Sequence, residues 1–156
     1  MKQWLLLGLA ILIVVALALP VLRNRERGPL DAAARAEAPG QFLELTHGAV
    51  HVQLDGPESG VPVVLVPGFS VPSYVWEPLD AQLAAAGFRV VRFDLYGRGW
   101  SARPDVVYDR VLFAHQLDEV LDALQIERAH VVGLSMGGAI AGRYAAQHPD
   151  RVDALV

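Results

Sequence analysis

The stretch His130-Val-Val-Gly-Leu-Ser-Met-Gly-Gly-Ala139 decides the fold of this chain, because it joins a strand to a helix around one serine. Its first half is apolar and β-branched, which is typical of a strand buried on both faces in a parallel sheet. The small residues that follow can continue as a helix to Gln147, where His148-Pro149 ends it. A strand, an abrupt turn and a helix are therefore expected here.

Gly133, Ser135 and Gly137 form the pattern Gly-x-Ser-x-Gly, which between a strand and a helix is typical of a nucleophile elbow. Such a turn holds its serine in a strained backbone conformation that points the hydroxyl away from the sheet edge. The positions two before and two after the serine must be small so that strand and helix can approach, and both glycines meet that need. A glycine-rich turn with an incidental serine is the competing interpretation, and the flanking strand and helix favour the elbow.

Composition excludes several classes of function. From Gln41 onward the chain has 8 Arg and 14 Asp plus Glu, a net charge of −6, which disfavours nucleic-acid binding. There is no cysteine, hence no thiolate nucleophile, no disulfide and no Cys-ligated metal site. The 5 histidines show no metal-binding spacing. We therefore expect no nucleic-acid partner, no metal and no cofactor.

The N-terminal segment predicts a membrane anchor. Trp4 to Leu22 is 19 residues without a charge, and a helix of that length spans roughly 28 Å, close to the hydrocarbon thickness of a bilayer. Three arginines between residues 23 and 27 favour the cytoplasmic face for the region that follows. The alternative is a cleaved secretory signal, since Lys2 precedes the apolar run and Ala16-Leu17-Ala18 is a small-x-small site.

We expect three regions along the chain. Residues 1–27 form the anchor with its flanking charges, residues 28–40 a linker, and residues 41–156 the N-terminal part of an α/β domain. The linker is bounded by Gly-Pro and Pro-Gly and has no apolar period.

The folded region begins with a hairpin and then alternates strand and helix. Residues 42–46 and 50–54 alternate in the strand period around His47-Gly48, which puts His47 in the turn and His51 on the solvent face. Further strands are expected at 61–67, 88–95, 129–134 and 151–156, and helices at 76–86, 108–124 and 137–147. This order predicts a mostly parallel, doubly wound sheet with right-handed crossovers. The glycine-rich turns lack phosphate-loop spacing, so nucleotide binding is only a weak alternative.

Three sequence motifs resemble motifs of the α/β-hydrolase superfamily and occur in the same order along the chain. The resemblance covers about residues 41–156. Val66-Pro-Gly-Phe69 is similar to its oxyanion loop, although the family usually has His where this chain has Pro67. Asp94-Leu-Tyr-Gly-Arg-Gly-Trp-Ser101 is similar to its Asp-x-x-Gly-x-Gly-x-Ser segment, and Gly133 to Gly138 to its elbow.

The resemblance implies a serine hydrolase that cleaves carboxylic esters, acylglycerols or other lipid esters among them, through an acyl-enzyme on Ser135. It also implies that the backbone N–H groups of Phe69 and Met136 form the oxyanion hole. Serine at the elbow argues against the dehalogenase and epoxide-hydrolase branches, which use aspartate there. Serine-dependent carbon–carbon hydrolases, perhydrolases, acyltransferases and a non-catalytic binding member of the fold remain open.

The superfamily places its triad acid and histidine after the elbow. After Ser135 this chain offers only His148, Asp150 and Asp153, which a helix of roughly ten residues would place about 15 Å from the serine. We therefore expect the catalytic base and its orienting acid to lie outside these 156 residues. The chain as given is then expected to have no appreciable turnover.

Overall fold

The computed structural model describes residues 2–23 and 30–156, and the chain divides into two compact units, Met1–Asp31 and Ala32–Val156. The first unit contains helix α1 (Lys2–Arg23). Crossing a bilayer takes about 20 consecutive, mostly apolar residues. Among the residues whose side chains the structure describes, no helix supplies an apolar segment of that kind. The predicted transmembrane helix over Trp4 to Leu22 is therefore wrong, and so are the membrane contact and membrane localisation inferred from it.

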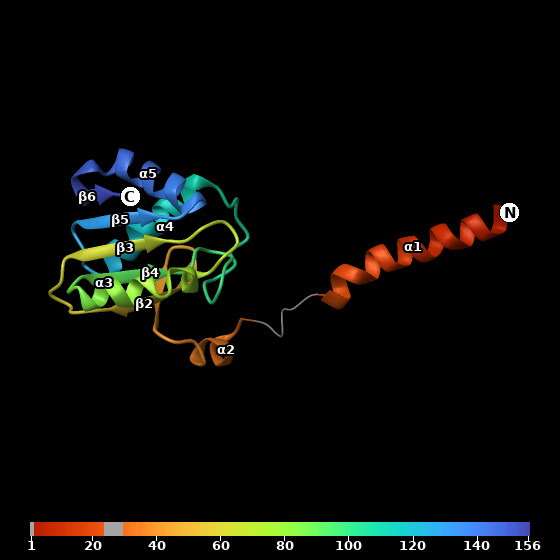
Figure 1. The fold of residues 1–156 in the computed structure, drawn as a ribbon, viewed down its shortest axis with the longest axis horizontal. Coiled ribbons are helices and arrows are strands. Elements are labelled where there is room, and N and C mark those ends of the chain that lie inside the picture. Colours follow the sequence, from red (N-terminus) through yellow and green to blue (C-terminus); the bar gives the residue numbers. More distant parts are fainter. Residues whose placement is uncertain (1, 24–29) are drawn as a thin grey trace. The chain divides into compact units, whose positions relative to one another are not determined.

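The second unit is built on a 6-stranded sheet in the order β1-β2-β4-β3-β5-β6 (Figure 1). Its strands are β1 (Gln41–Leu45), β2 (Gly48–Asp55), β3 (Pro62–Val66), β4 (Arg89–Phe93), β5 (Ala129–Gly133) and β6 (Val152–Leu155). β1 and β2 form an antiparallel hairpin, and β2 is antiparallel to β4. β4, β3, β5 and β6 run parallel. The predicted hairpin and mostly parallel sheet are confirmed.

Helices cover both faces of this sheet (Figure 1). These are α3 (Leu79–Ala85) on one face and α4 (Arg110–Ala123) and α5 (Met136–Gln147) on the other, with the 3₁₀ turns η1 (Ser73–Trp76) and η2 (Pro149–Arg151). The short helix α2 (Ala32–Ala36) precedes β1 and has no buried residue. Val64 and Val66 of β3 lie in the core cluster that includes buried residues of α4 and α5. Val63 and Leu65 lie in the cluster that η1 and α3 cover. Because β3 is buried on both faces, its continuous apolar run is a strong strand signal.

Two helices begin later than their patterns suggest. The helix expected from residue 76 is split, because Pro78 has no N–H and holds the preceding Glu77 in an extended conformation. Trp76 therefore lies in η1, and α3 begins at Leu79. The helix expected from residue 108 begins at Arg110, because the Asp109 carboxylate accepts hydrogen bonds from two N–H groups of the first turn at 2.8 and 2.9 Å.

The parallel strands bring three loops to one edge of the sheet. β3 and β5 pair from Val63 with His130 to Val66 with Gly133. The loop that follows Val66 therefore starts beside the turn that follows Gly133, and the loop after β4 starts at the same edge. The three motifs recognised in the sequence meet there.

Candidate active site

Ser135 occupies a sharp turn between β5 and α5. β5 ends at Gly133 and α5 begins at Met136, so two residues make the connection. Ser135 has φ 54° and ψ −113°, a backbone conformation that side-chain-bearing residues rarely adopt. Its side chain is exposed. The turn thus presents a serine hydroxyl to solvent at the carboxyl edge of the sheet.

The two glycines that flank this turn have no room for a side chain. A Cβ atom on Gly133 would lie 2.5 Å from the carbonyl oxygen of Gly137, on the first turn of α5. A Cβ atom on Gly137 would collide with the carbonyl oxygen of Val66 and would lie 2.7 Å from that of Pro67. The first turn of α5 therefore packs directly on the backbone of β3 and β5, and this contact fixes the position of Ser135.

The loop after β3 runs beside the serine. A Cβ atom on Gly68 would lie 3.8 Å from the Cβ atom of Ser135 and 3.5 Å from the carbonyl oxygen of Leu134. The next residue, Phe69, has a side chain that is 65% exposed. The structure thus places the Gly68–Phe69 turn beside the serine turn, so close that a side-chain carbon at Gly68 would be in van der Waals contact with Ser135.

Met136 is the first residue of α5. The N–H groups of the first helical turn have no carbonyl partner within the helix, and the helix dipole makes this end partly positive. A negatively charged oxygen next to Ser135 would therefore face a favourable electrostatic environment. Of the residues singled out in the sequence, Ser135, Met136 and Phe69 lie at this one place.

Histidines do not contact this serine within residues 30–156. His148 caps the far end of the 12-residue helix α5, about 18 Å along its axis from Ser135, and stacks on Tyr144 with ring centroids 4.8 Å apart. His115 is exposed and pairs with Glu119 at 3.3 Å. The other three histidines, at positions 47, 51 and 130, have ring contacts or hydrogen bonds elsewhere. The described residues supply a serine and N–H donors, but no histidine base at the serine.

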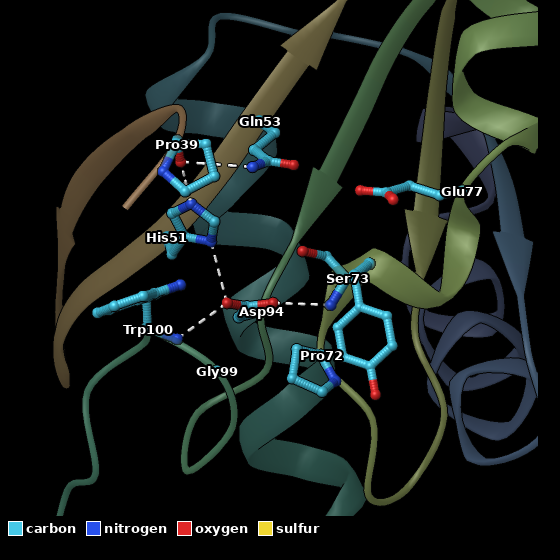
Figure 2. Close-up of a pocket in the computed structure, with 10 residues that line it drawn as sticks. Pro39, His51, Gln53, Pro72, Ser73, Glu77, Asp94, Gly99 and Trp100 are labelled. Carbon is cyan, nitrogen blue, oxygen red and sulfur yellow. Dashed lines mark hydrogen bonds and ion pairs between the residues drawn. The ribbon is translucent and has the colours of Figure 1, made fainter. Parts of the chain in front are cut away.

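A second polar cluster, made of His51, Asp94 and their hydrogen-bond partners, lies against the loop after β4 (Figure 2). The sequence did not predict it. His51 was expected on the solvent face of its strand, but it is 2% exposed, so that prediction is wrong. Its Nδ1 lies 2.9 Å from Oδ2 of Asp94, and its Nε2 is hydrogen-bonded to the carbonyl oxygen of Pro39. Asp94 also accepts hydrogen bonds from the N–H groups of Ser73 at 2.7 Å and Trp100 at 3.0 Å.

The surroundings of this pair shift the pKa of both members away from their ordinary values. Burial disfavours the charged imidazolium, but the hydrogen bonds to Asp94 and Pro39 outweigh burial and raise the pKa of His51. Burial also disfavours the carboxylate, but the hydrogen bonds from His51, Ser73 and Trp100 outweigh it and lower the pKa of Asp94. Both nitrogens of His51 face acceptors, so the doubly protonated imidazolium can donate to both, which favours the charged form of His51 beside the Asp94 carboxylate.

The Asp94 carboxylate is hydrogen-bonded to three segments of the chain, and Ser135 is not among these partners. It is therefore not placed as a triad acid. It joins β2 through His51, the loop after β3 through Ser73, and its own loop through Trp100. Among the residues that the structure describes, no three His, Asp or Glu side chains gather in a way that could hold a metal ion. The cluster is therefore a support for the loops that border Ser135.

Most of this chain is similar in sequence to known hydrolases. Residues 61–156 match the profile of the alpha/beta hydrolase fold. The 2-hydroxy-6-oxononadienedioate/2-hydroxy-6-oxononatrienedioate hydrolase of Paraburkholderia xenovorans (strain LB400) is 35% identical over 134 residues, which is 80% of this chain and 46% of that protein. The 2-hydroxymuconate semialdehyde hydrolase of Pseudomonas sp. (strain CF600) is 36% identical over 128 residues, 79% of this chain and 44% of that protein.

Solved structures agree with the sequence matches. The enol-lactonase from Burkholderia xenovorans LB400 has a TM-score of 0.71 with this chain at 30% identity, over 74% of this chain and 45% of that one. This chain spans less than half the length of the curated relatives it matches, 46% and 44% of the two hydrolases named above.

Proposed function

This chain belongs to the alpha/beta hydrolase fold family, and from that premise we propose that Ser135 is the nucleophile of a hydrolase that cleaves carboxylic esters. One observation carries the proposal: an exposed serine with φ 54° between a parallel strand and the N-terminus of a 12-residue helix, beside the loop after β3. That backbone conformation is costly, and strain of this kind is kept where function needs it.

The proposed chemistry is attack of the Ser135 Oγ on the acyl carbonyl carbon. The carbonyl oxygen gains negative charge as the C–O bond forms, and the N–H groups of Phe69 and Met136 are the proposed donors to it. A base takes the Ser135 hydroxyl proton and returns it to the departing alkoxide, so that an alcohol leaves, and water then hydrolyses the acyl-enzyme. A fixed pair of such donors in a water-poor site is typically worth several kcal/mol of barrier reduction.

The scheme needs a catalytic base, and we propose that the complete protein supplies it. A free serine hydroxyl is a weak nucleophile and needs an adjacent base. Within residues 30–156 no histidine contacts Ser135, whereas the matched relatives are more than twice as long as the matched segment. We therefore assign the base to the complete protein and test it there.

A second candidate reaction is supported by the relatives themselves. Two proteins with 35% and 36% identity to this chain are named hydrolases of 2-hydroxy-6-oxo dienedioates and of 2-hydroxymuconate semialdehyde. Carbon–carbon bond hydrolysis of such compounds is the alternative to ester hydrolysis. Ester hydrolysis is preferred because an exposed serine beside N–H donors fits acyl transfer through an acyl-enzyme.

The test compares the two reactions in the complete protein. We expect hydrolysis of a short-chain p-nitrophenyl ester to fall by about 10⁴-fold or more in Ser135→Ala. The control Ser59→Ala changes an exposed serine in the turn before β3 and is expected to keep the wild-type rate. Turnover of 2-hydroxy-6-oxo-2,4-dienoates without ester turnover would favour the second candidate. Ester turnover that survives Ser135→Ala would refute the proposal.

A further inference from the structure

The loops after β3 and β4 are joined by a contact that the proposed reaction does not itself use. The Nε of Arg98 donates a hydrogen bond to the carbonyl oxygen of Phe69 at 2.6 Å. The guanidinium carbon of Arg98 also lies 5.3 Å from the centroid of the Phe69 ring. One arginine thus holds both the main chain and the side chain of the residue that is the proposed oxyanion donor.

Phe69 has little other support from packing. Its side chain is 65% exposed, so the protein core holds its ring only weakly. The N–H and the carbonyl group of Phe69 are separated only by the two backbone torsions of that residue. A donor that fixes the carbonyl and a cation that covers the ring therefore restrict the direction of the N–H.

Arg98 is itself held in a tight turn. Its N–H donates to the carbonyl oxygen of Leu95 at 3.0 Å, its own carbonyl accepts from Ser101 N–H at 3.1 Å, and its Nη1 donates to the Gly97 carbonyl at 3.2 Å. Gly99 has φ 48°, and a Cβ atom there would collide with Oδ2 of Asp94. The turn is therefore packed against the buried Asp94 carboxylate.

This turn rests on the buried pair described above. Asp94 is 1% exposed, accepts the Trp100 N–H and is paired with His51. The same carboxylate accepts the Ser73 N–H, which lies at the far end of the loop after β3. The loop that carries Phe69 is thus attached to the loop after β4 at two points, Phe69 and Ser73.

We propose that Arg98 is a positioning residue for the oxyanion donor, which rests on the proposed function of Ser135. Arg98 sets the orientation of the Phe69 N–H toward the place where negative charge develops, and it does not touch the substrate. Arginine suits this role better than lysine because its planar group can donate in a fixed direction while it stacks on a ring.

The test uses the complete protein with Arg98→Gln and Arg98→Lys. Displacing a catalytic group by about 1 Å can reduce the rate by about 100-fold. We expect kcat to fall by between about 10- and 100-fold in Arg98→Gln, with KM nearly unchanged, because the lost interaction acts mainly in the transition state. We expect Arg98→Lys to recover part of that loss. If Arg98→Gln lowers the melting temperature strongly, kcat and KM of Arg98→Lys are compared with those of wild type instead.

A matched control and a second readout separate positioning from general destabilisation. Arg110 is an exposed arginine at the start of α4, and Arg110→Gln is expected to keep the wild-type kcat. The backbone ¹⁵N order parameter of Phe69 is expected to fall in Arg98→Gln and to stay constant in Arg110→Gln. Both results together support the role of Arg98.

The outcomes distinguish this inference from the proposed function. If the folded wild-type protein neither turns over an ester nor reacts with a fluorophosphonate, the proposed function fails and the role of Arg98 fails with it. If wild type is active through Ser135 but Arg98→Gln keeps its kcat within about twofold, only the role of Arg98 is refuted. A rise in KM with kcat unchanged would also overturn it, since Arg98 would then be a substrate-binding residue.

Discussion

The Nδ1 atom of His51 lies 2.9 Å from Oδ2 of Asp94, and the two side chains are 3% and 1% exposed. This pair connects β2, the end of the segment before β1 and the loops after β3 and β4. It lies outside the contacts of Ser135, yet both loops at the serine depend on it. Its charge state should therefore be visible in the stability of the second unit.

The first prediction concerns pH. His51 has its pKa raised above 6.5, so its contribution is fully present below pH 6.5 and is lost as the pH rises through the raised value of the folded protein. Asp94 has its pKa lowered below 3.8, so its contribution is present above pH 3.8 and is lost as the pH falls through the lowered value. The pair therefore stabilises most between these limits.

The measurement is the urea-derived free energy of unfolding from pH 5.5 to pH 9, in wild type and His51→Gln. We expect wild type to lose stability above pH 6.5 and the variant to show a flatter profile. At pH 6 the variant is expected to be less stable by about 3 kcal/mol, because Asp94 is left buried without its charged partner. Parallel profiles for the two proteins would contradict the assignment of a charged His51.

The second prediction compares two glycines on α5. A Cβ atom at Gly137 would collide with the Val66 carbonyl oxygen, whereas a Cβ atom at Gly142 would meet nothing within 4 Å. Gly137→Ala is expected to destabilise by about 2 kcal/mol or more, since the backbone of β3 or α5 must shift. Gly142→Ala is expected to stabilise by up to about 1 kcal/mol through helix propensity. Thermal unfolding measures both, and equal effects would contradict the close packing of α5 on β3.

The third prediction concerns the backbone at the serine. Ser135→Gly and Ser135→Ala both remove the hydroxyl, but only glycine adopts φ 54° without strain. The glycine variant is therefore expected to be more stable than the alanine variant by about 1 kcal/mol. Ala139→Gly, at an exposed position of the same helix, is expected to destabilise by about 1 kcal/mol and serves as the control. If Ser135→Gly were the less stable of the two variants, Ser135 would not be strained.

The elbow and the sheet could be predicted from the sequence because their constraints are local. Gly133, Ser135 and Gly137 lie within five residues, and the buried strands read as continuous apolar runs. The helix starts were displaced by Pro78 and Asp109, whose local effects override the apolar period. The predicted membrane anchor is wrong, because no helix among the described residues has the length and apolar character that crossing a bilayer takes.

The supporting contacts could not be predicted because they join distant segments. His51 pairs with a residue 43 positions away, and strand alternation placed it on the solvent face, which the loop after β4 covers. Arg98 reaches Phe69 across 29 positions of sequence. No periodicity encodes either contact. The antiparallel pairing of β2 with β4, Val52 opposite Phe93, brings His51 beside Asp94, and the parallel strands β3 and β4 bring their following loops, with Phe69 and Arg98, to one edge of the sheet.

Covalent labelling tests most directly whether Ser135 is the nucleophile. The complete protein is treated with a fluorophosphonate, digested, and the modified residue identified by tandem mass spectrometry. We expect one stoichiometric phosphonyl adduct, on Ser135, that is lost in Ser135→Ala and retained in Ser59→Ala. An adduct on another residue, or a folded protein that remains unmodified while a known serine hydrolase is labelled under the same conditions, would contradict it.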